Sequence, residues 1–490
     1  PVLTHGDICP MKSYDLILIG TGSAMNLLEP YLHENPEASV AVIDKDEPGG
    51  ICLNKGCIPS KILLYPADVV RTIHKARKLG IEAEDIKIDF SSIMERMRNY
   101  ISEDVHDIKE SLENSDFVDY YRAPARFVRP KTLEVAGETI SGSMIVLCTG
   151  SRPVIPDIEG LEETGYLTSE TILDLTARPK STLIIGGGYI AAEYGHFLSA
   201  MGSKVTIVGR NPRFIKDEEP EISRLAEAEM SSYLDILTGY EVTAVRKDKG
   251  GKTAVCRDTR GGKSLELTAE EILLAAGRTN NSDILDPDAG EIGTDADGWI
   301  HTDEYLETSV PGVWALGDAT GKHLFKHVAN YESEVVYYNA TAGDPSEKVK
   351  ADYHAVPHAV FSWPEIAAVG MGQAEASAVL GEENVLVGIS RYGETGKGAA
   401  MGLGDTGYFV KVLLENRTGR LLGAHIIGPE ASVLIQEIVN LMYTPSRTFT
   451  FSAMHIHPAL SEVVERALSN IMTARHYREH LEGRHRDHSH

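Results

Sequence analysis

Asp15-Leu-Ile-Leu-Ile19-Gly20-Thr-Gly22 is a short apolar run that ends on two glycines. The same arrangement returns in Ser181-Thr-Leu-Ile-Ile185-Gly186-Gly-Gly188, and a stretch with helical spacing follows each run. A buried strand, a glycine turn and a helix form the first half of a dinucleotide-binding unit, because the turn brings backbone N–H groups against a diphosphate. The duplication predicts an α/β fold with two Rossmann-like domains.

The residue that ends the second strand of each unit bears on the nucleotide bound there. Asp44 follows Gly20 by 24 residues, and Arg210 follows Gly186 by the same number. A carboxylate in this place accepts hydrogen bonds from a ribose diol, whereas an arginine suits the 2′-phosphate of NADP. Arg210 and the nearby Arg213 therefore favour NADP(H) in the second unit; solvated surface arginines are the alternative.

The two glycine turns differ at their third small position. Met25 stands there in the first unit, which implies a wider helix–strand crossing, whereas Ala191 keeps the position small in the second unit. Each unit closes on a further strand and glycine, in 145–150 and 272–277. A tight turn without a ligand is the alternative for the first unit, and the carboxylate of Asp44 favours a ligand.

Beyond about residue 351 the pattern becomes that of a mixed α+β domain. Alternating apolar residues in 408–414 and 421–427 predict an antiparallel sheet, and 434–442 has helical spacing. The last stretch, from about residue 479, carries four histidines among charged residues and has no apolar period. We expect a disordered tail there, with metal binding as the alternative.

Two cysteines lie between the glycine units, in Gly49-Gly-Ile-Cys52-Leu-Asn-Lys-Gly56-Cys57-Ile-Pro59-Ser-Lys61. Pro59 and the apolar-periodic residues after it predict a helix that begins just beyond Cys57. A thiol at a helix N-terminus lies near the positive end of the helix dipole, which lowers its pKa, and Lys61 adds positive charge one turn on. The close spacing lets both sulfurs meet as a disulfide. Metal ligation would need further cysteines or histidines at suitable spacing, and none adjoin.

Composition narrows the classes of protein. A chain of 490 residues with 42% hydrophobic and 24% charged residues indicates a soluble globular protein of several domains. The net charge of −25 argues against nucleic acid or an anionic membrane as partner, and no apolar run reaches membrane-spanning length. Five cysteines in such a chain are not a secreted disulfide framework. We expect a cytoplasmic enzyme, either ordinarily acidic or adapted to high salt.

The cysteine segment resembles the redox-active motif of the class I pyridine nucleotide-disulfide oxidoreductase family, whose members include dihydrolipoamide dehydrogenase and mycothione reductase. The resemblance covers nearly the whole of 11–475. Residues 308–318 are similar to the family's second flavin-binding segment, and 361–365 to the start of its dimer-interface domain. Residues 455–462, His-Ile-His-Pro-Ala-Leu-Ser-Glu, resemble its C-terminal catalytic motif.

The resemblance implies roles for two thiols and a histidine. Cys57 would lie beside the flavin as a thiolate, and Cys52 would exchange with the substrate disulfide. His457, oriented by Glu462, would exchange protons with the substrate thiol and come from the second subunit of a homodimer. Disulfide exchange needs such a base, because a thiolate must attack and the leaving sulfur must be protonated. His455 is expected to be structural.

The remaining roles concern the cofactors. The resemblance implies that Lys61 and Glu193 form an ion pair near the reactive nitrogen of the flavin, and that Tyr189 covers the flavin until nicotinamide enters. No metal is expected. The full sets of expected contacts are Gly20, Gly22, Asp44, Lys61, Thr149, Gly150, Gly317 and Asp318 for FAD, and Gly186, Gly188, Tyr189, Glu193, Arg210, Arg213 and Gly277 for NAD(P).

The predicted architecture is α/β, with two Rossmann-like dinucleotide-binding domains for FAD and NAD(P) and a C-terminal α+β dimerisation domain. In chain order we expect an N-terminal extension (1–10), an FAD-binding domain (11–156), an NAD(P)-binding domain (157–278), a central domain that completes the FAD site (279–350), an interface domain (351–478) and a histidine-rich tail (479–490).

Several features bear on the substrate. No cysteine follows Cys256, which disfavours relatives that carry a C-terminal thiol pair. Ser60 resembles dihydrolipoamide dehydrogenase, whereas Leu324-Phe-Lys-His-Val-Ala-Asn330, Ala459 and Arg210 resemble mycothione reductase-like members. We expect dihydrolipoamide dehydrogenase activity on a small-molecule or lipoyl-protein dithiol. The alternative is NADPH-dependent reduction of a low-molecular-weight disulfide of the mycothiol or γ-glutamylcysteine type. A flavin-binding scaffold subunit is disfavoured by the intact motifs.

Overall fold

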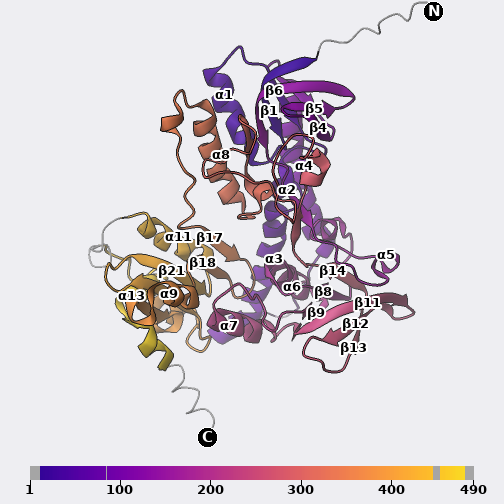
Figure 1. The fold of residues 1–490 in the computed structure, drawn as a ribbon. Coiled ribbons are helices and arrows are strands. Elements are labelled where there is room, and N and C mark those ends of the chain that lie inside the picture. Colours follow the sequence, from indigo (N-terminus) through magenta and orange to yellow (C-terminus); the bar gives the residue numbers. More distant parts are fainter. Residues whose placement is uncertain (1–10, 84, 445–452, 480–490) are drawn as a thin grey trace, which may run out of the picture. The chain divides into compact units, whose positions relative to one another are not determined.

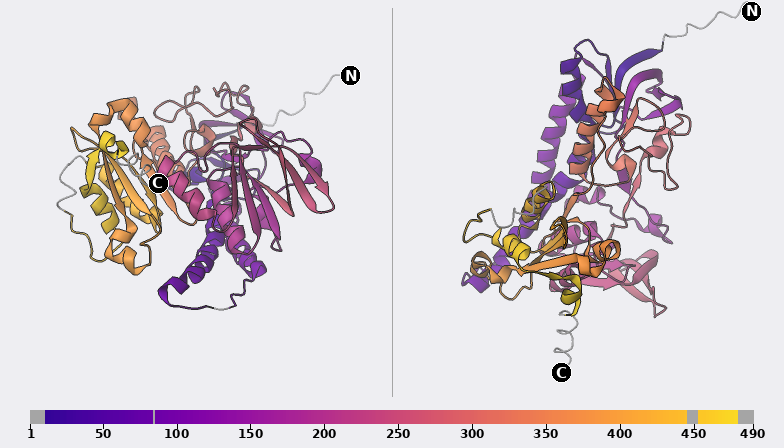
Figure 2. Two further views of the ribbon diagram at one scale, coloured as in Figure 1. Left: turned by 90° about the horizontal axis from the view of Figure 1, so that it is seen from below. Right: turned by 60° about the vertical axis from the view of Figure 1, so that its left-hand side comes forward.

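The computed structural model describes residues 11–83, 85–444 and 453–479. The predicted N-terminal extension and, apart from residue 479, the predicted tail lie outside the described residues. The chain forms two compact units, the first from 1–60, 95–154 and 277–352, and the second from 61–94, 155–276 and 353–490. Figure 1 and Figure 2 show their helices and strands. No helix in the described residues is long and apolar enough to cross a membrane.

Unit 1 is built on a seven-stranded sheet with a parallel part and an antiparallel extension. The parallel strands, in spatial order, are β3 (Val118–Tyr121), β2 (Val40–Ile43), β1 (Lys12–Ile19), β6 (Glu138–Leu147) and β16 (Val313–Ala315), which pairs with the C-terminal end of β6. The first half of β6 pairs antiparallel with β5 (Thr132–Val135), which pairs with β4 (Ala125–Arg129). The central strand β1 is therefore flanked by parallel neighbours. Parallel sheets are buried on both faces, so other elements must pack on each face of β1.

Helices cover one face of this sheet. Leu16 and Leu18 of β1 pack there in one cluster with Leu27, Leu112 and Val336. These three contacts come from the helices of this face: η1 (Ser23–Leu27) with α1 (Leu28–Glu34), the end of α4 (Phe90–Glu113), and α8 (Lys326–Thr341). The alternate residues of β1 point into a second cluster on the opposite face, with side chains from β4, β5 and 285–300. The continuous apolar run in β1 follows from this two-sided burial.

Unit 2 contains a second parallel sheet of the same design, with four strands. In spatial order these are β10 (Asp235–Thr238), β9 (Lys204–Gly209), β8 (Ser181–Ile185) and β14 (Glu271–Leu274). Helix α6 (Tyr189–Ala200) follows the glycine turn after β8, and nine of its twelve residues are buried. An antiparallel sheet of β11 (Tyr240–Asp248), β12 (Gly251–Asp258) and β13 (Leu265–Ala269) packs against the parallel sheet through one apolar cluster.

The C-terminal part of unit 2 is an antiparallel sheet of six strands. Their order is β17 (Pro357–Val360), β18 (Ile366–Gly370), β21 (Leu421–Ile427), β20 (Phe409–Glu415), β19 (Val385–Arg391) and β22 (Ile471–Thr473). Helices α11 (Ala431–Met442) and α13 (Glu462–Ser469) contribute Ile438, Val463 and Val464 to its main core. The α/β class and the α+β C-terminal part predicted from sequence are confirmed.

Local predictions fit closely, with three differences. The expected strand 421–427 is β21, and the expected helix over 434–442 begins three residues earlier in α11. After Gly22 the chain first forms the 3₁₀ turn η1 and only then the short helix α1. Met25 packs in the apolar cluster of this face, which leaves no room for the close α-helical crossing that a small residue allows. The predicted helix beyond Cys57 begins at Cys57 itself, in α3 (Cys57–Lys75).

Candidate active site

The two thiols stand on consecutive helices and belong to unit 1. Cys52 lies in the single-turn helix α2 (Gly50–Asn54), and Cys57 is the first residue of α3. A side-chain hydrogen bond with Cys57 and burial together raise the pKa of Cys52 above its usual range. The hydrogen bond is the largest cause, so the two sulfurs are in contact, as free thiols rather than as the disulfide that the sequence predicts. A thiol that shares its proton with a neighbour leaves the charge on that neighbour, here at the N-terminus of α3.

The first glycine turn packs so closely against neighbouring backbone that side chains would not fit there, and we call this arrangement a cradle. Gly20 has φ +99°, and a Cβ on it would lie 2.1 Å from the Cys148 carbonyl oxygen. A Cβ on Gly50, at the start of α2, would lie 2.7 Å from Cα of Gly22. The cysteine-bearing helix therefore rests directly on the turn. Sγ of Cys148 borders the same place, 3.6 Å from where a Cβ of Gly22 would stand.

Asp44 follows β2 and closes on the same turn. One of its carboxylate oxygens accepts hydrogen bonds from Thr21 N at 2.8 Å and from Thr21 Oγ1 at 2.5 Å. The other accepts from Asp46 N at 3.0 Å. A carboxylate has about four lone-pair sites, so capacity remains for a ribose hydroxyl. Asp44 thus lies where the sequence places it, and it also orders the turn.

Asp318, in the 3₁₀ turn η5 (Gly317–Thr320), belongs to a buried polar group. Ser151 Oγ donates a short hydrogen bond to its carboxylate, and Arg278 Nε donates to Ser151 Oγ at 2.7 Å. Burial raises the pKa of Asp318, and Ser151 and Arg278 oppose that shift. Ser151 and Arg278 are not among the site residues predicted from the sequence. Each directly follows a glycine that closes a predicted strand, at 150 and 277, and this position is the signal that could have identified them.

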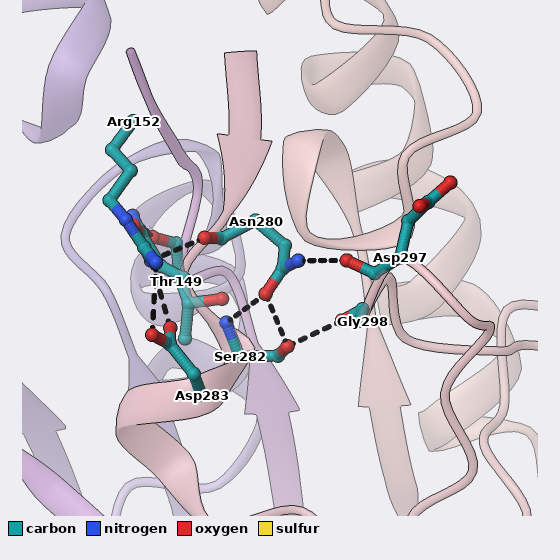
Figure 3. Close-up of polar contacts among 8 residues, drawn as sticks. Thr149, Arg152, Asn280, Ser282, Asp283, Asp297 and Gly298 are labelled. Carbon is teal, nitrogen blue, oxygen red and sulfur yellow. Dashed lines mark hydrogen bonds and ion pairs between the residues drawn. The ribbon is translucent and has the colours of Figure 1, made fainter. Parts of the chain in front are cut away.

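The segment beside this group is fixed by a second polar network, drawn in Figure 3. Arg152 donates to both carboxylate oxygens of Asp283 at 2.8 and 2.9 Å. Asn281 Nδ2 donates to the carbonyl of Thr149 at 2.9 Å, whereas Oγ1 of Thr149 is buried without a partner among the described residues. Gly150 follows, with open space where a Cβ would stand. An unpaired hydroxyl beside open space fits a bound polar ligand.

In unit 2 the second turn repeats this cradle. A Cβ on Gly186, at φ +132°, would lie 2.0 Å from the Ala275 carbonyl oxygen, whereas Gly188 faces open space. Gly277, which belongs to unit 1, also has nothing within 4 Å of where a Cβ would stand. Tyr189 follows Gly188 as the first residue of α6 and is 41% exposed. A diphosphate-binding turn packs tightly against backbone on one side and leaves open space for the diphosphate on the other, as this turn does.

The two arginines after β9 differ in their surroundings. Arg210 is exposed at the end of the strand. Arg213 is half-buried; its guanidinium donates to the carbonyl of Lys216, but Nε finds no partner among the described residues. Unpaired guanidinium donors beside the glycine turn suit an anionic group of the nucleotide.

Lys61 and Glu193 form an ion pair within unit 2. Nζ of Lys61 lies 3.0 and 2.8 Å from the two carboxylate oxygens of Glu193, whose side chain is buried. Phe361 N donates to the same carboxylate at 3.0 Å, and Nζ lies 4.6 Å from the centre of the Phe361 ring. The predicted pair therefore exists, and a backbone N–H fixes its carboxylate. The hydrogen bond from the Phe361 amide was not predicted from the sequence.

His457 and Glu462 are also brought together. Nδ1 of His457 lies 2.9 Å from Oε1 of Glu462, and Ala459 N donates to Oε2 at 3.0 Å. Both contacts lower the pKa of Glu462, that with His457 being the larger cause. The side chain of His457 is 73% exposed, so Nε2 is open to a reaction partner. His455 instead contacts Glu437 of α11 at 2.7 Å, as a structural residue would.

Comparison with known proteins places these features in one family. The family described as pyridine nucleotide-disulphide oxidoreductase matches residues 14–338, and its dimerisation domain matches 356–468. Mycothione reductase of Mycobacterium tuberculosis is 35% identical over 478 residues, covering 94% of this chain and 99% of that protein. Dihydrolipoyl dehydrogenase of Synechocystis sp. PCC 6803 is 30% identical over 475 residues, covering 93% and 98%.

A solved structure agrees with this assignment. The HOCl-induced flavoprotein disulfide reductase RclA from Escherichia coli superposes with a TM-score of 0.81 at 25% identity, covering 93% of this chain and 99% of that one. The matches extend over both glycine turns, the cysteine segment and the C-terminal histidine. This chain belongs to the pyridine nucleotide-disulphide oxidoreductase family, as an FAD-dependent oxidoreductase with a dimerisation domain.

Proposed function

We propose that Cys52 and Cys57 carry electrons between FAD and a disulfide substrate. The observation that carries the proposal is the hydrogen bond between the two thiols at the N-terminus of α3. In the reducing direction, Sγ of Cys52 attacks one sulfur of the substrate, and that disulfide breaks to release the first thiol. Sγ of Cys57 then attacks Sγ of Cys52, releasing the second thiol and leaving a Cys52–Cys57 disulfide. Two electrons have passed to the substrate.

FAD, when bound, would supply the two-electron exchange between the pyridine nucleotide and this disulfide. The cradle fits it, because Gly20 and Gly22 allow close approach to a diphosphate and the hydroxyl of Thr149 lacks a partner among the described residues. We assign the FAD contacts to Gly20, Gly22, Asp44, Lys61, Thr149, Gly150, Gly317 and Asp318. The pair of Lys61 and Glu193 would hold a fixed positive charge toward the flavin, because the Phe361 amide anchors its carboxylate.

The proton transfers fall to His457 in this proposal. Glu462 accepts a hydrogen bond from Nδ1–H of His457, which fixes the tautomer that leaves Nε2 as the base. His457 takes the proton of the Cys52 thiol at Nε2 as that sulfur attacks, and it gives this proton to the departing substrate thiolate. In the opposite direction it takes a proton from a substrate thiol. We propose that it acts on the thiols of the second subunit in a homodimer.

For the nucleotide we propose NADPH. Arg210 stands at the end of β9, where a carboxylate would bind the ribose of NADH, and Arg213 has an unpaired Nε among the described residues. The other contacts of the nucleotide would be Gly186, Gly188, Tyr189, Glu193 and Gly277.

For the substrate we propose a low-molecular-weight disulfide of the mycothione or bis-γ-glutamylcystine type. Two observations support it: the arginine at the ribose position, and the 35% identity to a mycothione reductase. Dihydrolipoamide is the second candidate, because dihydrolipoyl dehydrogenases are 28 to 30% identical over more than nine-tenths of the chain.

Steady-state assay of the FAD-loaded protein decides between these substrates. We expect NADPH oxidation that depends on mycothione or bis-γ-glutamylcystine, at a higher kcat/KM than with lipoamide or with NADH. The Cys52→Ser variant, which keeps FAD but lacks the exchanging thiol, is the control and should show no disulfide-dependent turnover. Absence of turnover with every disulfide would refute the enzymatic proposal. Faster turnover of lipoamide with NAD⁺ or NADH would refute only the choice of substrate and nucleotide.

A further inference from the structure

Lys326 is a charged residue of unit 1 that none of these roles uses. It is the first residue of α8, and its side chain is half-buried. Nζ donates a hydrogen bond to Ser23 Oγ at 2.8 Å. Ser23 is 2% exposed and directly follows Gly22 of the first glycine turn. A cation from the far end of the unit's sequence therefore reaches the turn proposed to hold the FAD diphosphate.

Neighbouring side chains fix the geometry of this contact. Ser23 Oγ donates its own proton to Asn330 Oδ1 at 2.9 Å, and Asn26 Nδ2 donates to the same oxygen at 3.3 Å. The hydroxyl of Ser23 therefore turns a lone pair toward Lys326. The ammonium cannot swing away without breaking this chain of hydrogen bonds.

The ammonium also has donors to spare. An ammonium carries three N–H donors, and Ser23 uses one. Among the described residues, neither a second acceptor nor a carboxylate within 4 Å of Nζ is found. A partly buried cation without an anion is costly unless a ligand supplies one. The pKa of Cys52 is raised mainly by its hydrogen bond with Cys57 and that of Cys148 mainly by burial, and the charge of Lys326 opposes both shifts.

We infer that Lys326 is a cofactor-binding residue that neutralises the diphosphate of FAD. Ser23 holds the ammonium at the turn where Gly22 leaves room for that group. The inference rests on the proposed FAD contacts of Gly20 and Gly22, and it does not depend on the identity of the disulfide. A glycine turn binds a diphosphate through neutral N–H groups; Lys326 adds a formal charge to them.

The test follows FAD release from the holoenzyme by recovery of flavin fluorescence in mild urea, over a series of salt concentrations. Lys326→Met should release FAD roughly ten- to a hundredfold faster than the wild type, the range expected for loss of one charge-assisted contact. Salt should accelerate release from the wild type and have little effect on the variant, because salt screens charge. Lys326→Arg should restore most of the retention.

Two further variants separate charge from folding. Lys322→Met removes the same charge four residues earlier, from an exposed lysine that bonds Thr302, and should release FAD like the wild type. Ser23→Ala breaks the tie but keeps the charge, so its release should remain salt-dependent. Equal release from the wild type and Lys326→Met, or equal salt dependence, would overturn the inference while leaving the disulfide reaction untouched. Faster, salt-insensitive release from Lys326→Met in a protein without disulfide turnover would support it and refute the proposed reaction.

Discussion

Cys52 and Cys57 differ in acidity because they occupy different positions in the structure. The pKa of Cys52 is raised first by its hydrogen bond with Cys57 and then by burial. Replacing Cys57 by Ala removes the larger cause, so the pKa of Cys52 should fall. Since only the thiolate reacts, the pH midpoint of alkylation at Cys52 should move to lower pH, by about one unit or more. Mass spectrometry of iodoacetamide-treated, reduced protein locates the label; an unchanged midpoint would show that the two thiols are not coupled.

The proposal that NADPH is the nucleotide rests on Arg210. Exchange to Glu removes a cation from the proposed 2′-phosphate site and supplies a carboxylate for a ribose diol. We expect KM for NADPH to rise roughly ten- to a hundredfold and KM for NADH to change little or fall. Arg224→Glu, the same exchange at an exposed position of α7 (Pro220–Met230), is the control. Equal effects on both nucleotides would remove the argument for NADPH.

Within the β8–α6 element, two glycines of one turn serve different purposes. An alanine at Gly186 would be strained at φ +132° and would press its Cβ to 2.0 Å from a carbonyl oxygen. At Gly188 the backbone is extended and a Cβ meets nothing within 4 Å. Gly186→Ala should therefore lose stability, by about 1–3 kcal/mol for the backbone strain alone, as a fall in the melting temperature. Gly188→Ala should melt like the wild type but bind NADPH more weakly; normal NADPH binding there would exclude this turn as the diphosphate site.

Helices α3 and α6 are joined by a second buried contact next to the Lys61–Glu193 pair. His196 of α6 is fully buried and bonds Asp68 of α3 at 2.8 Å, with Arg71 and Glu193 also facing it. Burial is the main cause that lowers its pKa. Below pH ~6.5 the unfolded chain binds a proton that the folded one rejects, so stability is full above that pH and falls on acidification.

The melting temperature of the holoenzyme should consequently decrease from pH 7.5 to 5.5, and His196→Gln should reduce that decrease. Each unit by which the pKa is lowered corresponds to ~1.4 kcal/mol. His33→Gln, at an exposed position of α1, should keep the wild-type slope. His358 acts with the opposite sign: although burial lowers its pKa, Glu218 raises it more, so it stabilises at low pH. A slope in His196→Gln equal to that of the wild type would show that His196 does not titrate in this range.

At the scale of the whole molecule, sequence could predict what repeats locally and little that joins distant segments. Two strand–turn–helix units, β21 and the helical start at Cys57 follow from apolar spacing, glycine and proline. The tie between Lys326 and Ser23 joins residues 303 positions apart, and the Phe361 amide meets Glu193 across 168. No local pattern encodes such contacts, because they depend on how whole elements pack. Pairs such as Lys61 and Glu193 were foreseen only through the family resemblance.

The assembly of the molecule carries the last prediction. If His457 serves the thiols of the second subunit, a subunit with Cys57→Ser and a subunit with His457→Gln should complement each other. Their heterodimer would contain one site with both thiols and an intact His457–Glu462 pair, and one site that lacks both groups. Co-expression with two different affinity tags isolates this species, and its kcat should be about half that of the wild type. Each variant homodimer is the control and should be nearly inactive. A heterodimer as inactive as the homodimers would place His457 and the thiols of one site in the same subunit, because then neither site of the mixed dimer would be whole.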